Sequence, residues 1–103
     1  MMKKIYLLIK YEKNKQLKAY ILDLSRSGMG LAAISKLKEG LAIDILPENK
    51  SLPKLQAKII YTSKLPRKRY NYRMGVKFIN LDKKQQGNLD KFIKKIERRG
   101  KQR

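Results

Sequence analysis

The sequence predicts a mainly β protein, an antiparallel barrel or sandwich of six strands followed by one C-terminal helix. Over most of the first 80 residues, apolar and polar residues alternate, which is the periodicity of half-buried strands. From residue 82 onward, the apolar residues instead fall at helical spacing. The length of 103 residues predicts a single domain, because two domains would each bury too little apolar surface.

Six stretches carry the strand pattern, and together they place the strands within residues 5–80. Turn-forming residues separate the strands most clearly at residues 12–15, 47–53 and 64–68. The predicted apolar faces are, in chain order, Ile5, Leu7, Ile9 and Tyr11; Leu17, Ala19 and Ile21; the run Met29 to Ile34; Leu41, Ile43 and Ile45; Leu55, Ala57, Ile59 and Tyr61; and Tyr70, Tyr72, Met74, Val76 and Phe78.

The last segment predicts an amphipathic helix over residues 82–99. Asp82 and Gln85 have the spacing of a capping box at its start. Gly100 is predicted to end the helix, which leaves a short basic tail over residues 100–103. The apolar stripe of the helix consists of Leu89, Phe92, Ile93 and Ile96.

The composition excludes several catalytic chemistries. The chain has no Cys and no His, which removes thiol nucleophiles, His-based triads and the usual zinc ligands. Its eight carboxylates form no recognisable acid–base pair, and no phosphate-cradling loop motif occurs. We therefore expect a non-catalytic protein without a metal or another cofactor. The apolar stretch Ile5–Ile9 is too short to span a membrane, and we expect a cytoplasmic protein.

The charge indicates an anionic partner. Lys and Arg number 27 against 8 Asp and Glu, which gives a formal net charge of +19. Such a surface attracts phosphates in nucleic acids, nucleotides or lipid headgroups. Twenty of the cations are Lys, which indicates diffuse charge more than the planar recognition that Arg provides. A nucleotide bias of the source would explain many of these lysines equally well.

One segment, from Asp23 to Leu31, is more specific than the rest. It joins two predicted strands and combines short polar side chains with two glycines. Asp and Ser side chains can accept hydrogen bonds from nearby backbone N–H groups, and Gly28 is predicted to supply a positive φ. On turn chemistry alone, the simpler interpretation is a β-turn that binds no ligand.

The spacing Asp23-x-Ser25-x-x-Gly28 resembles the D/N-x-S-x-x-G motif of the PilZ domain family. Two predicted strands precede it, the stretch Tyr72–Phe78 resembles the last core strand of that family, and the helix completes the pattern. The resemblance covers about residues 5 to 97. It implies a six-stranded antiparallel barrel with a helix against it, and a bacterial signalling role in sensing cyclic di-GMP without catalysis.

The resemblance also implies ligand contacts at matching positions. Asp23 and Ser25 would hydrogen-bond the guanine and its surroundings, while Gly28 would keep the turn tight and open. Arg26 lies inside the motif, where it could pair with a ligand phosphate or remain a solvated turn residue.

The second motif of the family, R-x-x-x-R ahead of the first strand, has no counterpart, because no Arg precedes Arg26. Lys3 and Lys4 stand there as candidate ligand contacts, but they offer point charges without a planar fork. Two lost contacts worth ~1.5–3 kcal/mol each would move a micromolar affinity toward millimolar. We therefore expect weak cyclic di-GMP binding, or a degenerate adaptor that acts through an unidentified protein partner.

A basic nucleic-acid-binding barrel is the alternative. Residues 64–73 combine four arginines and lysines beyond Pro66 with Tyr70 and Tyr72, a mixture suited to non-specific binding of single strands. The simpler interpretation is a solvated hairpin with both tyrosines on the core face. Likewise, the nine cations of residues 83–103 could meet RNA, an acidic protein or a membrane surface, or form a solvated helix face.

Overall fold

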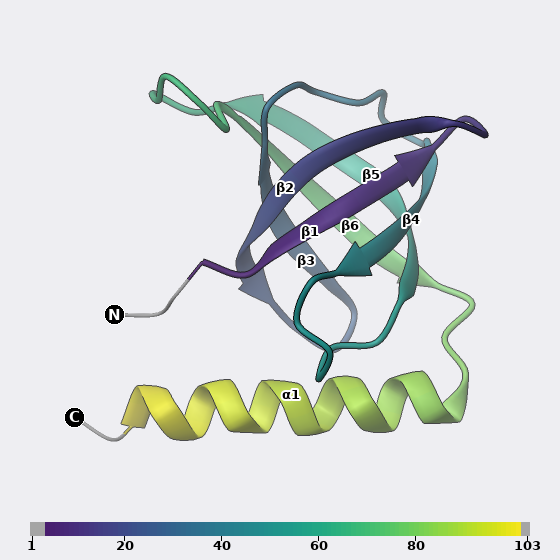
Figure 1. The fold of residues 1–103 in the computed structure, drawn as a ribbon, viewed down its shortest axis with the longest axis vertical. Coiled ribbons are helices and arrows are strands. Elements are labelled where there is room, and N and C mark those ends of the chain that lie inside the picture. The colour runs from purple at the N-terminus through teal and green to yellow at the C-terminus, as the bar shows by residue number, and fades with distance from the viewer. Residues whose placement is uncertain (1–3, 102–103) are drawn as a thin grey trace.

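The computed structural model describes residues 4–101, with side chains described as far as Ile96. Six strands form a closed antiparallel barrel in the order β1-β2-β3-β6-β5-β4, and one helix lies across an end of the barrel (Figure 1). This confirms the predicted fold. The elements are β1 (Tyr6–Tyr11), β2 (Lys15–Leu24), β3 (Gly28–Ala33), β4 (Ala42–Pro47), β5 (Leu55–Lys64), β6 (Tyr72–Ile79) and α1 (Lys83–Lys101).

The barrel interior is the hydrophobic core. A closed barrel turns one face of every strand inward, so alternating apolar residues from all six strands meet in one place. The largest fully buried side chains all belong to predicted apolar positions. They are Leu7, Ile9, Leu31, Ile45, Leu55, Ile59, Met74 and Leu89.

The alternation is interrupted by two β-bulges. Between β2 and β3 the pairing skips Leu22, so that Asp23 pairs with Gly30 and lies outside the barrel. Between β5 and β6 it skips Ile60, and 42% of the Tyr61 surface is exposed. The prediction that Tyr61 faces the core was wrong, because one extra residue exchanges the inward and outward faces of a strand.

Two further residues predicted to lie on strands lie just beyond them. Strand β6 begins at Tyr72, and Tyr70 precedes it with a positive φ of 50°. Its ring packs edge-on against Tyr6 and Tyr20, so the prediction that it lies on the core face was wrong. Ile34 follows the end of β3 and is 47% exposed. The apolar pattern of each strand thus extends beyond its paired residues, after the end of β3 and before the start of β6.

Helix α1 begins with the predicted capping box. The Gln85 amide donates to Asp82 Oδ1 at 2.7 Å, and the Asp82 amide donates to Gln85 Oε1 at 3.0 Å. The helix runs two residues further than predicted, through Gly100 to Lys101, because a glycine weakens a helix without having to end it. Residues 102 and 103 of the predicted tail lie outside the described residues. Within residues 4–101, no helix is long and apolar enough to cross a membrane.

The apolar stripe of α1 belongs to the barrel core. Leu52, in the loop between β4 and β5, is buried in the same cluster, and Gln85 Nε2 donates to the Lys54 carbonyl at 2.8 Å. The helix therefore covers the end of the barrel that this loop borders (Figure 1). The stripe residues that contact the core are Leu89, Phe92, Ile93 and Ile96.

Deleting residues 82–103 should destabilise the domain. Burying a side chain such as Leu or Phe contributes ~1.5–3 kcal/mol before entropic losses, and the deletion would expose the barrel surface that these side chains cover. We expect a lower melting temperature or aggregation, measured by circular dichroism and light scattering. Deleting only residues 98–103 is the control, since it keeps the apolar stripe. A chain ending at Leu81 that melts like the full chain would make α1 an independent arm.

Candidate functional site

The motif segment is a tight turn between β2 and β3. The Ser25 amide donates to the Gly28 carbonyl at 2.9 Å, and the Ser25 hydroxyl donates to the same oxygen at 3.3 Å. The Ser27 amide in turn donates to Ser25 Oγ at 3.4 Å. Both serines are exposed. The Ser25 hydroxyl therefore organises its own turn while remaining accessible from outside.

Gly28 is required by a close approach between strands. Its φ is not positive, so the prediction that it provides a left-handed turn residue was wrong. A Cβ at this position would lie 2.1 Å from the carbonyl oxygen of Val76 on β6. Any side chain would push β3 away from β6, and a glycine inside a strand is typical of such contacts.

Asp23 is held in place from two sides. The Gly30 amide donates to Asp23 Oδ1 at 2.9 Å, and Arg73 Nη2 donates to Oδ2 at 2.7 Å. Arg73 Nε donates to the Tyr61 hydroxyl at 3.1 Å. The two bulges therefore turn Asp23 and Tyr61 outward to either side of Arg73, which projects from β6.

Two facing glycines make room for this arrangement. Gly30 of β3 pairs with Gly75 of β6. A Cβ on Gly30 would lie 2.9 Å from the Asp23 carboxylate, and one on Gly75 would lie 2.1 Å from the Tyr61 ring. The carboxylate and the ring thus lie directly on the sheet backbone, where any other residue would carry a side chain.

This network keeps hydrogen-bonding capacity for a ligand. Hydrogen bonds with Tyr61 and then with Asp23 raise the pKa of Arg73 above its ordinary value, against the opposing effect of desolvation. Like any arginine, Arg73 is a permanent cation at physiological pH. The Asp23 side chain remains 62% exposed. Because a carboxylate offers about four lone-pair directions, Asp23 can accept further hydrogen bonds from a ligand.

Arg26 is directed toward the helix. Its Nε lies 2.8 Å from Asp90 Oδ1 on α1, and 72% of the Arg26 side chain and 41% of the Asp90 side chain are exposed. An ion pair this exposed adds little stability. It does link the motif turn to α1. Arg26 is largely solvated, as one of the two interpretations expected, and its contact with a ligand phosphate stays a prediction.

The structure brings Lys4 to a group of tyrosines beside the motif. Lys4 Nζ lies 5.0 Å from the ring centroid of Tyr20, which is three residues before Asp23 on β2. Lys3 lies outside the described residues. Whether either lysine contacts a ligand remains a prediction.

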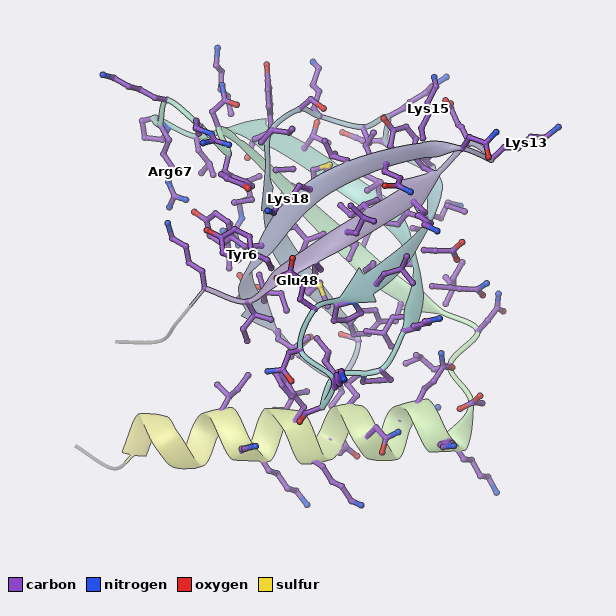
Figure 2. The ribbon with its side chains drawn as sticks, in the orientation of Figure 1. Tyr6, Lys13, Lys15, Lys18, Glu48 and Arg67 are labelled. Carbon is purple, nitrogen blue, oxygen red and sulfur yellow. The ribbon has the colours of Figure 1, made fainter. Side chains whose placement is uncertain are left out.

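Tyr6, Tyr20 and Tyr70 form one aromatic group, which we call the tyrosine cluster. Their ring centroids are 5.2–6.0 Å apart in edge-to-face arrangements. Arg67 Nη1 donates to the Tyr20 hydroxyl. Figure 2 shows Arg67 on the same side of the barrel as Tyr6 and Lys18, with Lys18 Nζ 5.3 Å from the Tyr6 ring centroid.

Sequence reasoning missed the partners of Asp23. A signal for Arg73 was present, because it shares the outward face of its strand with Gly75, and a glycine inside a strand marks a close approach. Tyr61 carried no such signal, since the bulge before it reverses its face. Arg67 lies in an aperiodic loop, so its contact with Tyr20 could not be predicted. In the described part of the chain, no group of three acidic residues could hold a metal ion.

Comparisons with known proteins agree with this architecture. A solved structure, the PilZ domain with c-di-GMP of YcgR from Escherichia coli, matches with a TM-score of 0.77 and 22% identity. The match covers 94% of this chain and 84% of that chain. No curated protein matches the sequence. The family model described as PilZ domain matches residues 5–95. With the whole barrel and most of the helix inside that match, the chain belongs to the PilZ domain family.

Proposed function

We propose that this domain is a non-catalytic receptor of cyclic di-GMP signalling that binds the dinucleotide weakly on the outer face of β2, β3 and β6. The observation that carries the proposal is the Asp23 carboxylate, which two protein groups hold and which is nevertheless 62% exposed. It stands in the motif of the family to which the chain belongs. The fold shared with a PilZ domain with c-di-GMP supports the same function.

The chemistry of guanine suits this site. Its Watson–Crick edge presents N–H groups, and an ionised carboxylate is an acceptor that can receive two of them side by side. Asp23 is already oriented by Gly30 and Arg73, so binding would cost little side-chain entropy. The exposed Ser25 hydroxyl would contact the ligand beside it.

The proposed affinity is low because phosphate-binding arginines are few. No Arg stands ahead of Tyr6 in the sequence, and Arg26 is engaged with Asp90. Lysines at positions 3 and 4 cannot supply the paired, planar hydrogen bonds that a guanidinium makes to phosphate. If cyclic di-GMP does not bind at all, the domain is instead an adaptor that acts through a protein partner.

Replacing Asp23 and Ser25 together by Ala should abolish the weak binding of cyclic di-GMP. The double variant removes the guanine acceptor and the adjacent hydroxyl but leaves the core untouched, so it should still fold. Binding can be measured by titration calorimetry and by NMR titration, and folding by thermal melting. Asp44→Ala, which removes another exposed carboxylate on β4, is the matched control and should bind like the original chain.

Two results would contradict this proposal. Micromolar or tighter binding by the original chain would refute the low affinity. No binding at millimolar ligand would refute the receptor function and favour the adaptor.

Adding a short N-terminal extension with Arg-x-x-x-Arg just before Lys3 should strengthen binding about tenfold or more, since each charge-assisted contact is worth ~1.5–3 kcal/mol. An extension with Lys-x-x-x-Lys is the control, because it adds the same charge without guanidinium groups. Calorimetry on both chains gives the comparison. An equal gain with lysines would assign the effect to charge alone, and no gain with arginines would mean that the Asp23 turn does not form a pocket.

The tyrosine cluster and its surrounding cations favour one second candidate, non-specific binding of single-stranded nucleic acid. Such binding would be electrostatic, and its affinity should fall steeply with salt through counterion release. Fluorescence anisotropy with a mixed-sequence oligonucleotide at low and high salt measures this dependence. Tight, sequence-selective binding that persists at high salt would make nucleic acid the main ligand of the domain.

A further inference from the structure

The tyrosine cluster gathers several cations, and Glu48 lies beside Tyr6, where its backbone amide donates to the Tyr6 carbonyl at 3.1 Å. Lys4 and Lys18 lie over the rings of Tyr20 and Tyr6, at 5.0 and 5.3 Å. Arg69 Cζ lies 5.7 Å from the Tyr70 ring centroid. None of these cations, nor Arg67, forms an ion pair with a carboxylate among the side chains that the structure describes. Four cations without an ion-pair partner against one neighbouring carboxylate favour the binding of an anion on this surface.

Within this group, Arg67 is the cation that is held in position. The loop between β5 and β6 carries it across to β2, where Nη1 donates to the hydroxyl of Tyr20. Tyr20 is only 6% exposed, so this anchor is itself fixed by its surroundings. Tyr70, with its positive φ, closes the same loop and packs its ring on Tyr20. Arg67 remains exposed, and most of its five N–H donors point to no protein partner in the described chain.

The sheet register relates Arg67 to the Asp23 network. Tyr20 pairs with Ala32 on β3, and Ala32 pairs with Arg73 on β6. Neighbouring strands are ~4.8 Å apart, so the backbones of Tyr20 and Arg73 are separated by about 10 Å. Between them lies Ala32, which is fully buried beneath the neighbouring side chains. Arg67, anchored on the Tyr20 hydroxyl, and Arg73 therefore belong to the same outer face of β2, β3 and β6.

We propose that Arg67, positioned by the Tyr20 hydroxyl, binds a phosphate of the same nucleotide whose guanine donates hydrogen bonds to Asp23. This inference rests on the proposed function, and it assigns a phosphate contact to Arg67, which lies 39 residues beyond Gly28, the last motif residue, in sequence. Arg73 is a positioning residue that holds Asp23. Arg67 suits the role because a guanidinium offers a rigid fork to phosphate oxygens, and part of its side-chain entropy is already lost to Tyr20.

The test is an NMR titration of the full chain with cyclic di-GMP, which measures weak dissociation constants and follows the Arg67 Nε–Hε signal directly. Arg67→Ala should weaken binding about tenfold or more, the effect of one charge-assisted hydrogen bond. Arg67→Lys should restore only part of the affinity. Tyr20→Phe, which keeps the ring and removes the anchoring hydroxyl, should weaken binding less than Arg67→Ala. The Arg67 signal should shift as ligand is added.

The matched control is Lys68→Ala, which removes one charge from the next position of the same loop. We expect it to bind nearly like the original chain. Equal losses in Arg67→Ala and Lys68→Ala would assign the effect to bulk charge, as for a nucleic-acid surface, and would overturn the inference. Unchanged binding by Arg67→Ala would overturn it and leave the proposed function standing. No binding by the original chain at millimolar ligand would overturn both. Melting curves of every variant show that the fold is retained.

Discussion

Closure of the barrel is the constraint on which the rest of the structure depends. Once six strands form a cylinder, every residue faces either a packed apolar core or the outside, and the two faces alternate along each regular stretch of strand. In strict alternation with Ile21 and Ile59, Asp23 and Tyr61 would point into the core, where an unpaired carboxylate is too costly to bury. The two β-bulges solve this conflict. They turn both side chains outward to Arg73 while the strands on either side keep their apolar faces inward.

The outer face of β3 and β6 serves folding and the proposed binding through the same small residues. Gly28 lets β3 approach the backbone of β6, whereas Gly30 and Gly75 let the Asp23 carboxylate and the Tyr61 ring lie on the sheet. Binding sites are usually shaped by loops around a rigid scaffold. Here the glycines remove side chains from the outer face of the sheet itself. The position of the Asp23 carboxylate is therefore set by β-sheet geometry more than by loop conformation.

Two structural links connect this face with other parts of the molecule. The Arg26–Asp90 ion pair joins the motif turn to α1, which covers one end of the barrel. The bond from Arg67 to Tyr20 joins the β5–β6 loop to β2. A phosphate that attracts either arginine would therefore compete with, or add to, a contact that holds a neighbouring element. The proposed ligand binding would then be coupled to the placement of the helix through an exposed ion pair, which is weak enough to exchange, and to that of the loop through a part-buried hydrogen bond.

The pattern of apolar residues predicted the six strands, most of the core and the class of fold, because burial in a closed barrel acts on each strand locally. The capping box of α1 was predictable for the same reason, since both of its residues lie within one helical turn. The spacing of Asp23, Ser25 and Gly28 was enough to locate the motif in the sequence. Only the tertiary structure decided what Asp23 contacts, why Gly28 is a glycine and where Arg67 lies. These features depend on the pairing register and on contacts between residues up to 50 positions apart, as in the Asp23–Arg73 pair. Neither the register nor such distant contacts can be predicted from the local sequence.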